Sequence, residues 1–229
     1  MNYIVIGLGS FGSAIARNLT GSGHDVMGVD KDVNRIEALK DQMTHAIAVD
    51  ATDESAVREF PLQETDMVIV AIGENIGANI MATAILKQHK ARKLISRAIS
   101  KVHQTVLEAM NVDVIINPEE EAAEIWSIKL SMKGVHDVHY LAGPYYVIEI
   151  EVPAGMVDHT LDNLKLLEKY KVLLLTTFTV RKSTNPMGIS KQDYTINKIS
   201  DPATLLREGE IMVVYGNIKD IRKMVADFR

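Results

Sequence analysis

Apolar residues in the first half of the chain gather in short runs, separated by stretches with helical spacing. Short apolar runs predict buried strands, and apolar residues three or four apart predict amphipathic helices. Strands are predicted at residues 3–8, 26–30, 45–50, 67–72, 94–98 and 112–116. Helices are predicted at residues 11–21 and 75–89, and from about residues 32, 54 and 101. Strands that alternate with helices at this spacing indicate a doubly wound α/β domain with a parallel sheet.

The same spacing predicts which face of each helix is buried. The helix from residue 32 has an apolar face with Ile36 and Leu39. The stripe predicted for the helix at 75–89 contains Ile76, Ile80, Ala84 and Lys87. The stripe predicted for the helix from residue 101 contains Val102, Val106 and Met110. We expect these stripes to pack against the sheet.

A further helix is predicted from Pro118 to about residue 132. An asparagine before it suits the N-cap, and the glutamates after the proline suit the positive end of the helix dipole. The six-strand domain does not require this helix, whose residues Ile125, Trp126 and Leu130 need a surface to cover them. We therefore predict that residues 118–137 form a connecting helix that takes part in self-association, with its tryptophan in a core or a subunit interface.

The last part of the chain has a different pattern. Residues 145–152 alternate between apolar residues and glutamates, which predicts a half-buried strand of an antiparallel or mixed sheet. Further elements are predicted as strands at 171–180 and 211–215, a loop at 181–191, a short helix after Thr160 and a closing helix from Ile218. The predicted domains are 1–117, the doubly wound domain; 118–137, the connecting helix; and 138–229, a smaller α+β C-terminal domain.

A glycine-rich turn joins the first predicted strand to the first helix. Gly7, Gly9 and Gly12 fit G-x-G-x-x-G, in which the first glycine permits a tight turn, the second lets a pyrophosphate approach, and the third lets the helix pack on the strand. Asp30 ends the second strand 18 residues after Gly12, near the spacing of a carboxylate that binds ribose hydroxyls. A plain helix N-cap is the alternative role for Asp30. The order of elements predicts a Rossmann-like nucleotide-binding domain.

Composition narrows the possible functions. The chain has 229 residues, of which 47% are hydrophobic, enough for one large domain or two small ones. Its net charge of −5 gives no reason to expect a nucleic-acid partner. It has no cysteine, which excludes a disulfide, a thiol nucleophile and a cysteine-bound metal, and which suits a reducing cytoplasm. Its apolar runs are far shorter than the roughly 20 residues that span a bilayer, so we expect a soluble protein.

Several motifs together resemble the RCK family. They lie at residues 4–12, 23–26, 29–30, 46–54 and 68–76. RCK domains are nucleotide-binding regulatory subunits of Ktr and Trk potassium-uptake systems. The resemblance covers the whole chain and implies a TrkA-N domain followed by a TrkA-C domain. It also implies a regulatory function without catalysis.

The resemblance implies roles for individual residues. The phosphate loop would comprise Gly7, Gly9, Ser10, Phe11 and Gly12. The adenosine side would comprise Asp30 and Lys31 at the ribose and Asp50, Ala51 and Thr52 at the adenine, with Gly73 and Asn75 closing the pocket. Arg97 stands where relatives have a basic residue near the phosphates, although its position also suits a solvated strand end. Glu119 stands where they have a carboxylate able to help hold a divalent cation, although it also suits the helix dipole.

One position departs from the family pattern. Ktr-type chains usually have an arginine after the second glycine, and that arginine reaches terminal phosphates. Ser10 offers only a neutral hydrogen bond, which is weaker than a charge-assisted one. The ligand therefore stays open between ATP, ADP and, as the alternative, NAD or NADH. We predict only a weak preference for ATP over ADP, or one that depends on a divalent cation.

Two functions follow from these observations. The resemblance implies a cytoplasmic gating subunit, held at the membrane by an integral-membrane potassium-translocating subunit. It further implies a homodimer that assembles into an octameric ring, and in some relatives a cyclic dinucleotide bound at the C-terminal domain. The alternative is an NAD(P)-dependent oxidoreductase, which needs a general acid or base beside the nicotinamide. The sequence offers no convincing His-Asp or Tyr-Lys pair for that chemistry.

Overall fold

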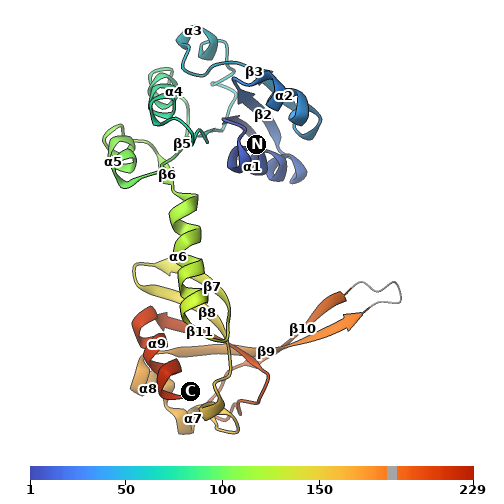
Figure 1. Ribbon diagram of the computed structural model, residues 1–229, viewed down its shortest axis with the longest axis vertical. Helices are drawn as coiled ribbons and strands as arrows, with labels where there is room; N and C mark the ends of the chain where they lie inside the picture. The colour runs from blue at the N-terminus through green and yellow to red at the C-terminus, as the bar shows by residue number, and fades with distance from the viewer. Residues whose placement is uncertain (185–189) are drawn as a thin grey trace. The chain divides into compact units, whose positions relative to one another are not determined.

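The computed structural model describes residues 1–184 and 190–229, which form two compact units, Met1–Glu120 and Glu121–Arg229 (Figure 1). The first unit contains a parallel sheet of strand order β3-β2-β1-β4-β5-β6, which confirms the predicted doubly wound fold. Its strands are β1 (Asn2–Ile6), β2 (Asp25–Asp30), β3 (His45–Ala48), β4 (Met67–Val70), β5 (Leu94–Arg97) and β6 (Val114–Ile116). Its helices are α1 (Ser10–Gly21), α2 (Val33–Leu39), η1 (Lys40–Gln42), α3 (Glu54–Val57), α4 (Ile76–Gln88) and α5 (Lys101–Ala109).

The side chains of the central strand β1 alternate between two apolar cores. Ile4 and Ile6 share one core with Leu86 of α4. Val5 belongs to the other core, together with Ile36 of α2, which lies in the apolar face predicted for that helix. Helices therefore cover both faces of the sheet, which explains why β1 and β4 are continuous apolar runs. The order of strands reverses between β1 and β4, and ligands of such sheets bind at this switch point, beyond the carboxyl ends of the strands.

The buried faces of α4 and α5 differ from the predicted stripes. Helix α4 buries Asn79, Ala82, Thr83 and Leu86, and helix α5 buries His103 and Leu107. Ile76 and Val102 of the predicted stripes are 40% and 78% exposed. The stripe predictions are wrong because these helices bury polar side chains, Asn79, Thr83 and His103, that hydrogen-bond to one another.

The second unit packs helices on an antiparallel sheet of strand order β10-β9-β11-β8-β7 (Figure 1). Its strands are β7 (Val135–Ala142), β8 (Tyr145–Glu151), β9 (Leu173–Thr184), β10 (Ser190–Ile199) and β11 (Ile211–Asn217). Its helices are α6 (Pro118–Ser131), which begins in the first unit, η2 (Ala154–Met156), α7 (Leu161–Leu164), α8 (Leu166–Tyr170) and α9 (Ile218–Asp227). The core joins Ile148 and Met212 of the sheet to Ile128 of α6 and Ile221 of α9. This is the predicted smaller α+β fold.

Two strands of the second unit are absent from the sequence predictions. Strand β7 begins at Val135, inside the range 118–137 predicted to connect the domains, and it pairs with β8. The predicted loop at 181–191 is wrong for residues 181–184 of β9 and 190–191 of β10, and the positions between these strands lie outside the described residues. Strand β10 has no regular apolar alternation, and its pairing with β9 defines it.

Helix α6 buries only part of its apolar surface within the second unit. Ile128 is buried, and Ile125 packs against the same core, so these residues do not need a partner chain to cover them. Trp126 and Leu130 are 58% and 81% exposed. A core position for Trp126 is therefore wrong, and its place in a subunit interface stays a prediction. Among the described residues, no helix is long and apolar enough to cross a membrane.

Candidate functional site

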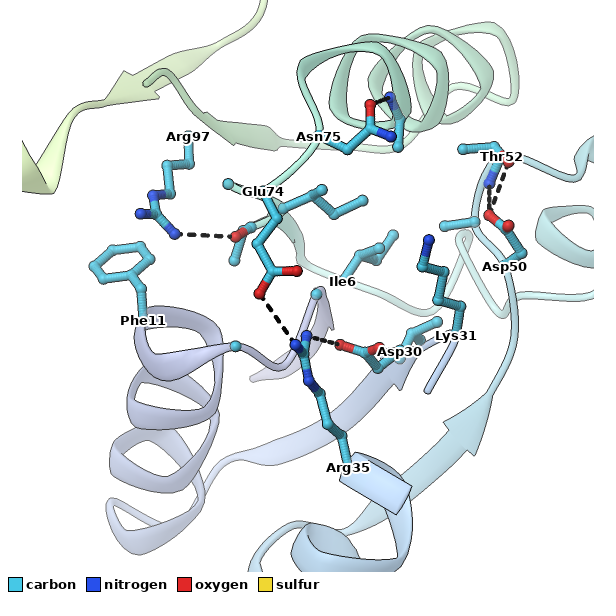
Figure 2. Close-up of a pocket in the computed structure, with 18 of the residues that line it drawn as sticks. Ile6, Phe11, Asp30, Lys31, Arg35, Asp50, Thr52, Glu74, Asn75 and Arg97 are labelled. Carbon is cyan, nitrogen blue, oxygen red and sulfur yellow. Dashed lines mark hydrogen bonds and ion pairs between the residues drawn. The ribbon is translucent and has the colours of Figure 1, made fainter. Parts of the chain in front are cut away.

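The first unit contains a pocket of about 690 Å³ beyond the carboxyl ends of its central strands (Figure 2). A pocket of this size suits a small-molecule ligand or cofactor. The predicted binding residues that line it are Gly7, Gly9, Ser10, Phe11, Asp30, Lys31, Asp50, Ala51, Thr52, Gly73, Asn75, Arg97 and Glu119. The structure thus brings together all the predicted residues except Gly12, which lies behind the loop. That they bind a nucleotide stays a prediction.

The three glycines of the loop have different surroundings. Gly7 has a φ of +91°, and a Cβ there would lie 2.9 Å from the backbone nitrogen of Ile72. A Cβ on Gly12 would lie 1.9 Å from the carbonyl oxygen of Gly7, so only glycine lets α1 pack this closely. A Cβ on Gly9 would meet no atom within 4 Å, and Gly9 caps α1 without a side-chain hydrogen bond. The helix N-terminus therefore presents backbone N–H groups to open space, where an anion can bind.

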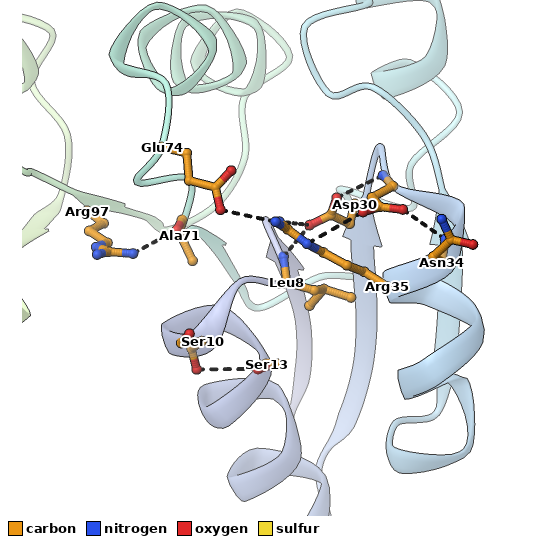
Figure 3. A network of polar contacts seen from close by, with 10 residues as sticks. Leu8, Ser10, Ser13, Asp30, Asn34, Arg35, Ala71, Glu74 and Arg97 are labelled. Carbon is orange, nitrogen blue, oxygen red and sulfur yellow. Dashed lines mark hydrogen bonds and ion pairs between the residues drawn. The ribbon is translucent and has the colours of Figure 1, made fainter.

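Asp30 is buried at the end of β2, and backbone groups hold its carboxylate in place (Figure 3). Its Oδ2 accepts a hydrogen bond of 2.7 Å from the N–H of Leu8, and its Oδ1 accepts one of 2.9 Å from the N–H of Asp32. The N-cap of α2 is Asp32, whose side chain accepts from the N–H of Asn34. The N-cap alternative for Asp30 is therefore wrong. Its Oδ2 also faces the guanidinium of Arg35 at 3.5 Å, whereas its Oδ1 keeps one further lone pair for a ribose hydroxyl.

Arg35 and Glu74 also line the pocket, and neither is among the binding residues predicted from the sequence. The guanidinium of Arg35, from α2, lies 3.0 Å from the carboxylate of Glu74 and 3.5 Å from that of Asp30. The hydrogen bond to Glu74 and the charge of Asp30 raise the pKa of Arg35. Glu74 follows β4, so this ion pair joins the two halves of the parallel sheet across the pocket (Figure 3). Two features of the sequence could have indicated these residues. Arg35 lies about one helical turn after Asp30, the acid of β2, and Glu74 directly follows Gly73.

Asp50 and Thr52 form a closed turn at the predicted adenine end. Both the N–H and the hydroxyl of Thr52 donate to Oδ1 of Asp50, at 2.9 and 2.8 Å. These two hydrogen bonds lower the pKa of Asp50. The carboxylate therefore stays ionised and acts as a hydrogen-bond acceptor, which suits recognition of an amino group better than proton transfer.

Arg97 lies at the opposite end of the pocket, at the end of β5. Its guanidinium lies 5.3 Å from the ring centre of Phe11, and a Cβ on Gly73 would lie 2.6 Å from its Nη1. Nη1 donates to the carbonyl of Ala71 at 3.4 Å, and Nη2 forms an ion pair with Glu119. Its Nε is buried and has no hydrogen-bond partner within the described part of the chain. An anionic ligand here would gain a partly desolvated cation.

A buried polar cluster supports this end of the pocket from behind. Asn79 donates from Nδ2 to the carbonyls of Ile72, at 2.9 Å, and Arg97, at 3.2 Å. Its Oδ1 accepts from the hydroxyl of Ser96 at 3.0 Å and lies 3.2 Å from Nε2 of His103. Burial lowers the pKa of His103, so the neutral imidazole is the stable form. Asn79 therefore fixes the backbone of Ile72, next to Gly73, and the backbone of Arg97, which the sequence pattern did not reveal.

Glu119 is the predicted ligand of a divalent cation. It pairs with Arg97, and it lies in no group of three or more His, Asp or Glu side chains that could hold a metal ion, as judged over residues 1–184 and 190–229. Magnesium is commonly bound by one or two carboxylates together with the phosphates of a substrate. Glu119 therefore fits a cation that a nucleotide brings with it, and does not fit a cation held by protein alone.

Comparisons with known proteins show which proteins this chain is similar to. The TrkA-N domain family matches residues 3–118. The chain is 31% identical to Ktr system potassium uptake protein C of Bacillus subtilis (strain 168), over 96% of this chain and 94% of that protein. It is 30% identical to Ktr system potassium uptake protein A of Vibrio alginolyticus, over 93% of this chain and 91% of that protein.

Solved structures support the fold of each unit. The NAD(P)-binding domain of an exopolyphosphatase-related protein from Archaeoglobus fulgidus is 27% identical, with a TM-score of 0.51, over 56% of this chain and 96% of that one. The GsuK RCK domain is 18% identical, with a TM-score of 0.53, over 99% of this chain and 46% of that one, a likeness that shows the fold alone. The resemblance to RCK proteins is thereby confirmed, and the chain belongs to the TrkA-N domain family, in the group that contains the Ktr system potassium uptake proteins.

Proposed function

We propose that this protein is a nucleotide-binding regulatory subunit of a Ktr-type potassium uptake system. The observation that carries the proposal is a pocket in which the glycine loop, Asp30 and Arg97 face one another, in a chain related to Ktr proteins along nearly its whole length. A bound nucleotide would shift the balance between two conformations of the subunit assembly. Such a shift requires only that the two conformations differ in their affinity for the ligand.

The ligand in this proposal is an adenine nucleotide, with ADP and ATP as the first candidates. Asp30 binds the ribose, Asp50 and Thr52 face the adenine, and the N-terminus of α1 binds the pyrophosphate. NAD or NADH is the alternative, because a solved relative of the first unit is an NAD(P)-binding domain. All of these ligands share the adenosine diphosphate group that the loop and Asp30 would recognise.

A divalent cation would bind between Glu119 and the phosphates of the ligand. Glu119 would then exchange its partner Arg97 for the cation, and the guanidinium would be free to face a phosphate. Because Ser10 supplies no charge, this exchange would decide how well a third phosphate is held. We therefore expect the preference for ATP over ADP to depend on a divalent cation.

The protein would act in the cytoplasm as a homodimer that assembles into an octameric ring. This ring would lie beside an integral-membrane potassium-translocating subunit. The exposed side chains of Trp126 and Leu130 support a contact through α6, since exposed apolar residues of this size favour burial. Light scattering of the full chain should give a dimer or a larger assembly. A monomer at micromolar concentration, with and without nucleotide, contradicts this part of the proposal.

A regulatory function fits the pocket better than an NAD(P)-dependent oxidoreductase. Four of its charged side chains are engaged in two ion pairs, Arg35 with Glu74 and Arg97 with Glu119. The pKa of Asp50 is shifted downward, away from the range useful for a general acid or base at neutral pH. Sustained NADH oxidation with candidate substrates would favour the enzyme instead.

Potassium uptake in the native host tests the proposal. Deletion of the gene should lower potassium uptake and growth at limiting external potassium. The wild-type gene should restore both, whereas a gene carrying Asp30→Ala should restore neither at equal protein level. Uptake that does not change on deletion overturns the proposed function.

A further inference from the structure

We propose that Arg35 binds the phosphate chain of the bound nucleotide, and that Glu74 forms an ion pair with Arg35 while the pocket holds no nucleotide. This assignment rests on the proposed function, because it names a contact within the same site. It adds a specificity-determining pair, Arg35 and Glu74, to the loop and the ribose carboxylate.

The position of Arg35 places its charge beside the phosphate loop. Its Nη1 lies 3.5 Å from Oδ2 of Asp30, and the same oxygen accepts the hydrogen bond from the N–H of Leu8. Leu8 stands between the first two glycines of the loop. The guanidinium therefore shares a carboxylate oxygen with the backbone that holds the pyrophosphate in folds of this kind. Its other nitrogen, Nη2, is directed across the pocket to Glu74 (Figure 2).

The charges that line the pocket favour an exchange of partners when an anion binds. The lining includes four carboxylates, Asp30, Asp50, Glu74 and Glu119, and three cations, Lys31, Arg35 and Arg97. A nucleotide diphosphate adds further negative charge, so its phosphates are repelled unless cations turn toward them. Glu74 is the most exposed partner of Arg35, at 80%, and water can solvate it once it is released. Glu74 is therefore the carboxylate that leaves Arg35 when a phosphate binds.

The pair also links parts of the fold that the ligand must reach. Arg35 lies on α2, after the ribose carboxylate, and Glu74 lies in the turn between β4 and α4. When a phosphate replaces Glu74 as the partner of Arg35, the ion pair between α2 and the turn after β4 is broken. The bound ligand then connects these two parts of the fold. Arg35 also occupies a position beside Asp30 that the ribose would use. Removal of Arg35 should therefore weaken phosphate binding without weakening the binding of adenosine.

Titration calorimetry of the full chain, in the presence of a chelator, tests the assignment with adenosine, AMP, ADP, NAD and NADP. We expect Arg35→Gln to lower the affinity for ADP about tenfold or more, as for a lost charge-assisted hydrogen bond, and to change the affinity for adenosine less than about twofold. We expect Glu74→Gln to raise the affinity for ADP about three- to fivefold, because a competing partner is removed. The matched controls are Arg92→Gln and Glu37→Gln, which change the same charges outside the pocket and should leave every affinity unchanged.

Several results overturn the assignment. Equal losses for adenosine and ADP in Arg35→Gln would mean a structural function, and no loss for ADP would mean no contact. A loss confined to NADP would place Arg35 at the ribose 2′-phosphate instead of the phosphate chain. If the wild type binds none of these ligands, the proposed function fails, and the assignment fails with it. Binding by the wild type with no selective effect in the variants refutes the assignment alone.

Discussion

The two ends of the pocket hold their charged side chains in different ways. At the end predicted to bind the ribose, which we call the ribose end, backbone N–H groups of Leu8 and Asp32 fix the carboxylate of Asp30. At the opposite end, side chains fix Arg97, through the ring of Phe11 and the carboxylate of Glu119. The first arrangement follows from a local strand–turn–helix motif, and the second depends on tertiary contacts. We infer that the carboxylate of Asp30 is held in place before ligand binds, whereas Arg97 changes partners when ligand binds.

The largest effect is expected from Asn79, which supports the Arg97 end. Replacement Asn79→Ala removes the donor to the carbonyls of Ile72 and Arg97 and leaves His103 without its partner. We expect a loss of about 2–4 kcal/mol in the free energy of unfolding, as for a buried polar network. Urea denaturation measures it, with Gln88→Ala on the exposed face of α4 as the control. Equal stability of the two variants would show that the network does not support the pocket.

A second change tests the ribose end. We expect Asp30→Ala to weaken adenine-nucleotide binding by about 1.5–3 kcal/mol, because a charge-assisted hydrogen bond to the ribose is lost. Calorimetry measures the affinity, and circular dichroism checks that the variant is folded. The control is Asp53→Ala, which removes an aspartate N-cap that does not line the pocket. A folded variant with wild-type affinity contradicts the ribose assignment.

A third change tests the Arg97 end of the pocket. Ser10→Arg supplies the charge that Ktr-type relatives have at this position. We expect the affinity for ATP to rise about tenfold more than the affinity for ADP, because only a third phosphate extends past the N–H groups of the loop. Calorimetry with and without a chelator measures both affinities. Equal changes for the two ligands, or a strong wild-type preference for ATP in chelator, contradict the prediction.

The smallest expected effect is a pH dependence from His103. Burial lowers its pKa in the folded state, whereas the unfolded chain titrates near 6.5. As the pH falls below 6.5, the unfolded state binds a proton that the folded state does not, so stability falls by at most about 1.4 kcal/mol per pH unit. Urea denaturation at pH 7.5 and 5.5 should show a smaller difference for His103→Gln than for the wild type. The control is His45→Gln, which changes an exposed histidine. If the unfolding free energies at the two pH values differ equally in His103→Gln and in the wild type, His103 is not the source of the pH dependence.

The difference between the two ends also explains what the sequence could predict. The glycine loop and Asp30 lie within one strand–turn–helix–strand segment, so residue spacing alone predicts the ribose end. Glu74 pairs with Arg35, and Asn79 with Ser96 and His103, all far away along the chain, so neither the apolar pattern nor the glycine spacing identifies Glu74 or Asn79. The apolar stripes of α4 and α5 fail for the same reason, since hydrogen bonds between distant side chains bury polar faces there. The edge strand β10 depends likewise on its pairing with β9.

The decisive measurement is a calorimetric titration of the wild-type full chain with ADP, ATP, NAD and NADH. We expect saturable binding of an adenine nucleotide at one site in each chain, weakened in Asp30→Ala and unchanged in Asp53→Ala. We also expect that bound NADH is not consumed. No binding of any of these ligands to folded protein, or binding that Asp30→Ala leaves unchanged, would contradict the account.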